Sequence, residues 1–137
     1  NQAYEMGGIY KATGEGNLAY VTREDCARAA AAALASSFDG QRVLNITGPE
    51  ALSQAELAQI VSNITGKPLN YVPVELEALI QGMVDGGLPR PVAETYASID
   101  EATAKGQFEN VSGDFEELTG EKPTSVSELL KAHKDEL

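Results

Sequence analysis

The side chains that most often do chemistry in proteins are scarce and scattered in this sequence. It holds one cysteine, Cys26, and one histidine, His133, and neither has a second such residue at a spacing that could hold a metal ion. Cys26 lies in an alanine-rich run rather than beside a basic or metal-ligating cluster, so we expect a small buried apolar side chain. The sequence therefore favours neither a metal centre nor a Ser-His-Asp triad.

Acidic pairs and short glycine motifs are the next candidates. Adjacent carboxylates at positions 100–101 and 116–117 have the composition of an acid-base pair, but exposed helix faces are commonly acidic, and we interpret both pairs as solvated. Gly14 and Gly16 lack the third glycine and the preceding buried strand of a dinucleotide fingerprint, and they predict a turn. No Tyr-x-x-x-Lys pair offers a hydride-transfer base.

Apolar and aromatic residues gather around a glycine loop at positions 86–87, between two expected helices. A loop of this kind is a place where the wall of a cleft or a mobile lid can lie. Core packing is the default for such side chains, and a ligand-facing role for two or three of them is a hypothesis. The candidate substrate-binding residues are Met83, Leu88, Pro89, Val92 and Tyr96.

The clearest local pattern is strand, turn, capped helix and strand between Arg42 and Val72. Residues 43–46 form a short β-branched and apolar run that Gly-Pro ends, and residues 69–72 form a second one. Between them, Ser53 and Glu56 have the spacing of a capping box, an apolar stripe follows at helical period, and Gly66 supplies the stop.

The remaining elements are mostly helical. An alanine-rich helix is expected over 23–37, opened by Thr22 or Arg23, with Glu24 and Asp25 in a capping role in its first turn. Further helices are expected over 75–82 and 91–105, and capping-box patterns at 114–117 and 125–128 open helices to about 119 and 133. Short strands or a hairpin are expected at 9–10 and 17–21. The predicted fold class is α/β, or α+β in isolation: a small, mostly helical domain with a few short strands.

Length and charge narrow the class of protein. The 137 residues, 1–137, suit a single domain, and a net charge of −11 argues against nucleic acid as a partner. No apolar run reaches the length of a membrane span, and the start does not resemble a signal peptide, so we expect a soluble, cytoplasmic protein. The final Lys-Asp-Glu-Leu spells a retrieval signal, which we interpret as a charged helix end.

Four segments in order carry a family resemblance: GEGNLAYVTREDCARAAAAAL, NITGPEALSQAELAQIVSNITGKPLNYV, GLPRPVAETYASIDEATAKGQF and VSGDFEELTGEKPTSVSELL. Together they resemble the C-terminal half of the NmrA-like atypical short-chain dehydrogenases, most closely the quinone reductase and triphenylmethane reductase branch. The resemblance covers nearly the whole chain.

This resemblance implies the substrate-binding portion of an NAD(P)H-dependent quinone- or dye-reductase-like protein. The family's Rossmann part with its G-x-x-G-x-x-G motif has no counterpart in residues 1–137, so we expect no cofactor and no catalysis by this chain alone; NADPH or NADH belongs to the full-length family. The family's C-terminal helices close over a quinone-like substrate, which favours the loop from Met83 to Tyr96, and no catalytic or cofactor-binding residue is carried over.

Two other interpretations remain open. One is a stand-alone, non-catalytic small-molecule or protein-binding module of the redox-sensing regulator type, and the other is a truncated gene product. Without a Rossmann half, an apolar face would be exposed, so we expect self-association or a partner chain that covers the alanine-rich helix of residues 23–37.

Overall fold

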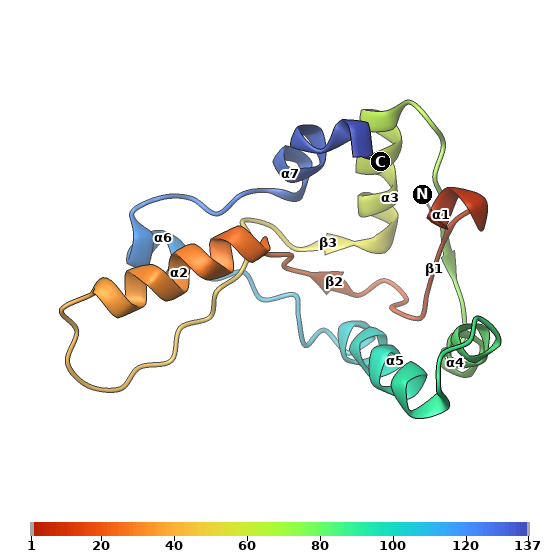
Figure 1. Cartoon of the computed structure of the whole chain (residues 1–137), viewed down its shortest axis with the longest axis horizontal. Helices are drawn as coiled ribbons and strands as arrows, with labels where there is room; N and C mark the ends of the chain where they lie inside the picture. Colours follow the sequence, from red (N-terminus) through yellow and green to blue (C-terminus); the bar gives the residue numbers. More distant parts are fainter. Residues whose placement is uncertain (1, 137) are drawn as a thin grey trace. The chain divides into compact units, whose positions relative to one another are not determined.

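The computed structural model describes residues 2–136, which form seven α-helices, one 3-10 helix and four short strands (Figure 1). The expected fold class, mostly helical with a few short strands, is confirmed. The chain divides into two compact units that each combine distant segments. Unit 1 contains residues 2–18 and Leu52–Glu109, and unit 2 contains Ala19–Ala51 and Asn110–Glu136.

Unit 1 holds two small sheets and most of the helices. Strand β1 pairs in parallel with β4, with Ile9 opposite Tyr71, and β2 pairs antiparallel with β3, with Asn17 opposite Ser53. Its elements are α1 (Gln2–Glu5), β1 (Ile9–Lys11), β2 (Asn17–Leu18), β3 (Leu52–Ser53), α3 (Gln54–Thr65), β4 (Tyr71–Pro73), α4 (Leu76–Asp85) and α5 (Arg90–Ala104).

Helix α3 begins and ends as its sequence predicts. The Ser53 hydroxyl accepts a hydrogen bond from the Glu56 amide at 3.2 Å, and the Glu56 carboxylate accepts one from the Ser53 amide at 2.8 Å. At the other end Gly66 adopts the left-handed conformation, with φ of 73°. Both boundaries are set by local chemistry, which is why the sequence shows them.

Unit 2 consists of α2 (Arg23–Ala35), α6 (Asp114–Thr119), α7 (Val126–Ala132) and the 3-10 helix η1 (Lys134–Glu136). Helices α2 and α6 pack against each other, and Phe115 of α6 is fully buried. Ser125 and Glu128 form the second predicted capping box, at the start of α7.

The predicted strand at 43–46 is wrong for the described structure. In the part of the chain that the structure describes, Val43, Leu44 and Ile46 form no backbone hydrogen bond, and the Asn45 amide donates to the Asp114 carboxylate at 2.7 Å. A strand exists only where a neighbour completes a ladder. The expected strands at 17–21 and 69–72 are shorter for the same reason, because only Asn17–Leu18 and Tyr71–Pro73 find partners.

Three predictions about single residues need correction. The capping box at 114–117 does not form, because Gly113 is the N-cap of α6 and the Asp114 carboxylate binds the Asn45 amide instead. Thr22, one of the two residues expected to open α2, is its N-cap, whereas Glu24 and Asp25 lie in the first turn and do not cap it. Cys26 is exposed rather than buried, since the buried face of α2 is formed by Asp25 and Ala29.

The two units differ in the size of their apolar interiors. Eight apolar residues of the described chain are buried, and only Ala29 and Phe115 among them lie in unit 2. Unit 1 holds the other six and a core cluster of Ile80, Ala93 and Ala97 between α4 and α5. No helix in residues 2–136 is both long and apolar enough to cross a membrane.

Candidate functional site

The glycine loop that the sequence singles out joins α4 and α5 into a helical hairpin in unit 1 (Figure 1). Gly87 takes a φ of 97°, a conformation that L side chains rarely adopt, and the Leu88 amide returns to the Met83 carbonyl at 3.1 Å. At the start of α5, Arg90 bridges Glu77 of α4 at 2.8 Å and Glu94 of its own helix at 2.9 Å. A backbone hydrogen bond in the loop and exposed ion pairs between the helices thus stabilise the hairpin.

The candidate substrate-binding residues separate into two groups. Met83 is half-buried and packs against the Ile80 cluster, so it serves the core of the hairpin. Leu88, Val92 and Tyr96 are exposed, with 37%, 39% and 56% of their surface accessible.

Val92 and Tyr96 lie on one side of α5, and Leu88 lies in the loop two residues before this helix begins. Residues four apart lie on one helix face, and Ile99, 47% exposed, continues the row. Pro89 is exposed at the N-cap position, where its carbonyl accepts the amides of Val92 and Ala93. We call Leu88, Val92, Tyr96 and Ile99 the α5 stripe; a ligand-facing role for it remains a prediction.

The position of α5 in unit 1 depends on a buried carboxylate that the sequence did not reveal. Asp100 is 3% exposed, accepts the Ala12 amide at 2.9 Å and binds the Lys11 ammonium at 3.2 Å. Its neighbour Glu101 is exposed and pairs with Lys105 at 2.7 Å. The solvated interpretation of positions 100–101 is therefore wrong for Asp100, which fixes α5 to the segment after β1.

The turn at Gly14 and Gly16 is confirmed and lies against the same helix. The Gly16 amide donates to the Thr13 carbonyl at 2.9 Å, and a Cβ at Gly16 would overlap the Thr103 carbonyl of α5. Tyr71 holds the turn from β4, since its hydroxyl donates to the Gly14 carbonyl at 3.0 Å. Only a residue without a side chain permits this approach.

Unit 1 also contains an open hollow of about 610 Å³ beside this turn. Two of its polar residues, Ser53 and Glu56, bind each other in the capping box, and hydrogen bonds from Ser53 hold the pKa of Glu56 below its ordinary value. The lining residues are Gly14, Glu15, Asn17, Ser53, Ala55, Glu56, Tyr71 and Pro73. None of the candidate substrate-binding residues lines it.

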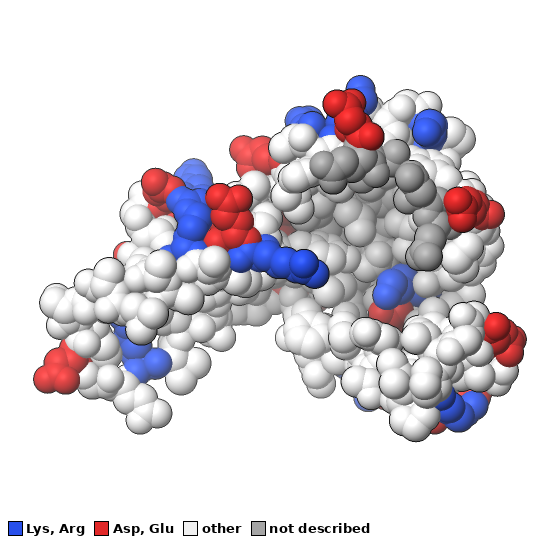
Figure 2. Space-filling model, in the orientation of Figure 1, with Lys and Arg blue, Asp and Glu red and all other residues white. Residues whose placement is uncertain are grey.

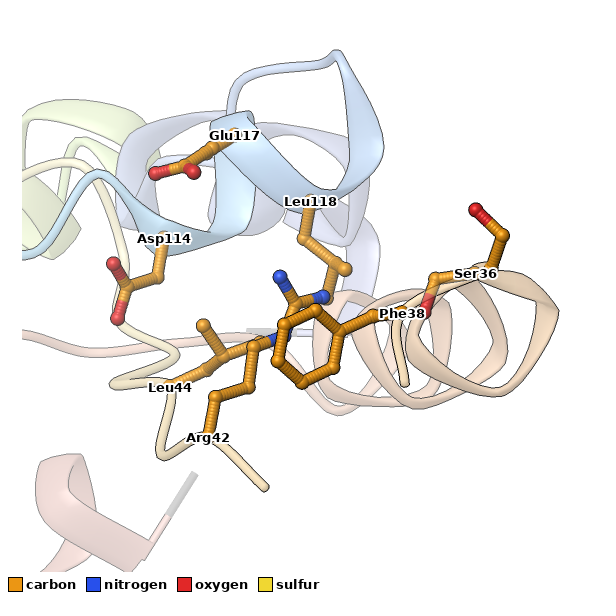
Figure 3. A pocket seen from close by; sticks show the side chains of 8 residues that line it. Ser36, Phe38, Arg42, Leu44, Asp114, Glu117 and Leu118 are labelled. Atoms are coloured by element: carbon orange, nitrogen blue, oxygen red, sulfur yellow. The ribbon is translucent and has the colours of Figure 1, made fainter. Parts of the chain in front are cut away.

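A second hollow, of about 330 Å³, lies within unit 2 (Figure 3). The Arg42 guanidinium stacks over the Phe38 ring at 4.4 Å, and Leu44 and Leu118 provide apolar walls, while Asp114 and Glu117 stand at one side. Ser36 and Ser37 complete the lining. Sequence reasoning missed this hollow because its walls come from segments about 70 residues apart, as in the bond from Asn45 to Asp114.

Metal ligands and two helix starts among the described residues can be compared with what a metal ion or a dinucleotide requires. No group of three or more His, Cys, Asp or Glu side chains in residues 2–136 is arranged to hold a metal. A pyrophosphate needs free backbone amides at a helix start and a close glycine approach. The starts of α2 and α3 are instead capped by Thr22 and Ser53, and both hollows carry carboxylates that would repel phosphate.

No protein-family model matches the chain, but comparison with known proteins finds oxidoreductases to which it is similar. Over nearly its whole length the chain is similar to the C-terminal portion of NAD(P)H-dependent oxidoreductases. It spans less than half the length of the curated relatives that it matches.

Three relatives show this similarity. The oxidoreductase YesF of Bacillus subtilis is 37% identical over 127 residues, which are 93% of this chain and 44% of that protein. The Citrobacter sp. triphenylmethane reductase in complex with NADP(H) superposes with a TM-score of 0.87 at 33% identity, covering 96% of this chain and 46% of that one. The Escherichia coli NADPH-dependent quinone oxidoreductase QOR2 with NADPH gives 0.90 at 26% identity, covering 98% and 47%.

Proposed function

We propose that the chain is the substrate-side portion of an NAD(P)H-dependent oxidoreductase of the NmrA-like type, with a quinone-like or dye-like aromatic compound as substrate. The observation that carries this proposal is the superposition, with TM-scores of 0.87 and 0.90, on the corresponding portions of a dye reductase and a quinone reductase. A cytoplasmic location, expected from the sequence, is part of the same proposal.

The α5 stripe is the surface that we assign to the substrate. Its exposed side chains are apolar or aromatic, and a flat aromatic ring binds such a surface through apolar burial and ring stacking. The core cluster behind it and the Asp100 anchor fix the helix in unit 1. The residues of this chain thus bind and orient a substrate. The nicotinamide cofactor, which would be bound by residues other than those of this chain, supplies the hydride.

A chimeric enzyme tests the proposal. This chain replaces the matching portion of the Citrobacter triphenylmethane reductase, and NADPH oxidation is followed with a quinone and with a triphenylmethane dye. We expect turnover by the chimera, whereas the isolated chain titrated with NADPH by calorimetry gives no binding heat. NADPH binding by the isolated chain, or a folded chimera that binds NADPH and reduces neither substrate class, would contradict the proposal.

Substitutions in the α5 stripe separate substrate binding from folding. In the chimera, Val92→Ala and Tyr96→Ala should each raise KM about tenfold, because each removes apolar contact area with the substrate. Melting temperatures should stay near that of the parent, since both side chains are exposed. Ser98→Ala, on another side of α5, is the matched control and should leave KM unchanged.

Strong binding of a quinone by the isolated chain without NADPH would favour the interpretation as a stand-alone binding module over the interpretation as a portion of an oxidoreductase.

A further inference from the structure

The exposed row of the α5 stripe ends where the segment after β1 covers the helix. Its last member, Ile99, is followed at helical spacing by Thr103. Thr103 is fully buried, however, because the turn at Gly16 closely approaches its carbonyl. The segment of residues 11–16 therefore borders the α5 stripe toward the C-terminal end of the helix.

Hydrogen bonds fix the start of this segment against α5. Lys11 stands opposite Pro73 in the parallel pair of β1 and β4, and its carbonyl accepts the Val74 amide at 3.1 Å. The next amide, that of Ala12, donates to Oδ2 of Asp100 at 2.9 Å. The backbone of Lys11 is held from both sides, so its side chain extends from a defined position.

The Lys11 ammonium lies at the edge of the α5 stripe because it binds Asp100. Asp100 follows Tyr96 by four residues, and residues four apart are neighbours on a helix. Nζ of Lys11 lies 3.2 Å from Oδ1 of Asp100, and the Lys11 side chain is 43% exposed, whereas the Asp100 side chain is 4% exposed. The carboxylate is thus buried, while the ammonium is open to solvent next to the position of Tyr96.

The buried acidic partner distinguishes this ion pair from others on the protein. Most Lys and Arg side chains on the face shown in Figure 2 lie beside Asp or Glu side chains. The pairs of Arg90 and Lys105, at the two ends of α5, are exposed on both sides, and water screens such pairs. Among the described residues Asp100 takes one of the three donors of Lys11, which leaves two for a ligand. Glu15, the other charged residue of the segment, lines the open hollow that the stripe residues do not line.

We propose that Lys11 is the specificity-determining residue of the α5 stripe: its ammonium donates a hydrogen bond to a carbonyl oxygen of a quinone whose ring lies on the stripe. This inference rests on the proposed function. A quinone carries carbonyl oxygens at the rim of a flat ring, which suits an ammonium at the edge of an apolar row. A cationic triphenylmethane dye such as malachite green offers no such oxygen, and the ammonium repels it. The stripe therefore selects quinones over cationic dyes.

Replacement of the lysine in the chimera described above tests this role with two substrates of different charge. Lys11→Met should raise KM for duroquinone about fivefold, because a hydrogen bond from a charged donor is lost. The same change should lower KM for malachite green or leave it unchanged, because a like charge is removed. Lys11→Arg keeps a charged donor and should restore the preference for the quinone. An equal rise in KM for both substrates would overturn the proposal, since a merely loosened α5 weakens both.

The carboxylate left behind by Lys11→Met needs a control of its own. Lys11→Met combined with Asp100→Asn removes the charge pair, while the Asn side-chain oxygen can still accept the Ala12 amide. We expect the same contrast between the two substrates in this double variant, and loss of the contrast would overturn the proposal. Lys105→Met, at the C-cap of α5, carries the same charge change and should leave both KM values unchanged.

A binding measurement without turnover separates this inference from the proposed function. In an NMR titration of the isolated chain, duroquinone should bind weakly and shift the amides around Tyr96, and Lys11→Met should weaken this binding about fivefold. A chimera that reduces neither substrate class rejects the proposed function, and the titration still decides the role of Lys11. Equal affinity of the wild type and Lys11→Met for duroquinone would overturn that role.

Discussion

In both units a buried aspartate joins distant parts of the chain by accepting a backbone amide, but the two aspartates differ in their surroundings. In unit 1 the buried Asp100 accepts the Ala12 amide at 2.9 Å, and in unit 2 the buried Asp25 accepts the Thr124 amide at 2.7 Å. Asp100 works beside the apolar core of α4 and α5, whereas Asp25 has only Phe115 and Ala29 as buried apolar companions. A buried carboxylate fixes which segments meet, but apolar burial supplies most of the stability.

The surroundings of Asp25 show which polar interactions stabilise unit 2 in addition to its few buried apolar side chains. Burial on its own raises the pKa of the Asp25 carboxyl, and hydrogen bonds from Thr124, Thr22 and Arg28 outweigh it, so that the pKa lies below the ordinary value. Arg28 also pairs with Glu121 and lies over the Phe115 ring at 5.6 Å. One arginine thus links α2 and α6 to the loop before α7.

The largest expected effect comes from removing the one large apolar side chain buried among the described residues of unit 2. Phe115→Ala should destabilise the protein by about 3–5 kcal/mol, because a large cavity would be left with few neighbours to fill it. Hydrogen exchange should show loss of protection in α2 and α6 while α4 and α5 keep theirs. Equal loss of protection in both units would mean that they unfold together, and would contradict a difference in stability between them.

Loss of the carboxylate tie should rank second. Asp25→Ala leaves the half-buried Thr124 amide without its acceptor and should cost about 2 kcal/mol in urea unfolding. Asp100→Ala is the counterpart in unit 1, and we expect a similar cost with the damage confined to the segment after β1. A cost near zero for Asp25→Ala would show that water replaces the carboxylate.

The Asp25 tie should also give a defined pH dependence. Because hydrogen bonds hold the folded pKa of Asp25 below its ordinary value, the stabilisation is fully present above that ordinary value and is lost as the pH falls through the folded pKa. The stability difference between the wild type and Asp25→Asn should therefore be constant near neutral pH and shrink in acid. A difference that grows on acidification would contradict the lowered pKa.

Two glycines offer a matched comparison of close packing in the units. A Cβ at Gly48 would overlap the Tyr20 carbonyl in unit 2, and one at Gly16 would overlap the Thr103 carbonyl in unit 1. Each change to alanine should cost about 1–3 kcal/mol, because backbone must move. Gly82→Ala, inside α4 with nothing within 4 Å of the added Cβ, should instead stabilise by about 0.5–1 kcal/mol. Thermal unfolding of the three variants measures the contrast.

The smallest effect should be the same in both units. Ser53→Ala and Ser125→Ala each remove an N-cap from a capping box and should each cost about 1 kcal/mol. Chemical denaturation of the two variants gives the comparison. A much larger loss for Ser125→Ala would show that the short helix α7 depends on its cap more than α3 does.

Helix boundaries were predictable wherever neighbouring residues decide them. The capping boxes at Ser53 and Ser125 and the stop at Gly66 were expected and are present. The box expected at Asp114 failed because its carboxylate found a distant amide, that of Asn45, 69 positions away. A local motif therefore predicts a cap only when no tertiary partner competes for the same side chain.

The candidate site was predictable in part. The pattern around the glycine loop identified Leu88, Val92 and Tyr96, which are exposed on α5 or in the loop before it, but it could not distinguish them from Met83, which packs into the core. It also missed Asp100, because an acidic residue on a helix gives no sign of burial until its partners, Lys11 and the Ala12 amide, are located. Side-chain direction toward core or solvent is a property of the packed helices.

The sequence by itself determined helices α2 to α7, the capping boxes of α3 and α7 and the glycine loop, because these depend on residues within about one turn of one another. Only the tertiary structure decided that residues 43–46 form no ladder, that Cys26 is exposed, and that Asp25 and Asp100 are buried. Each of these properties depends on contacts between segments far apart in the chain. Burial, strand pairing and the partner of a carboxylate are therefore fixed only when those segments meet.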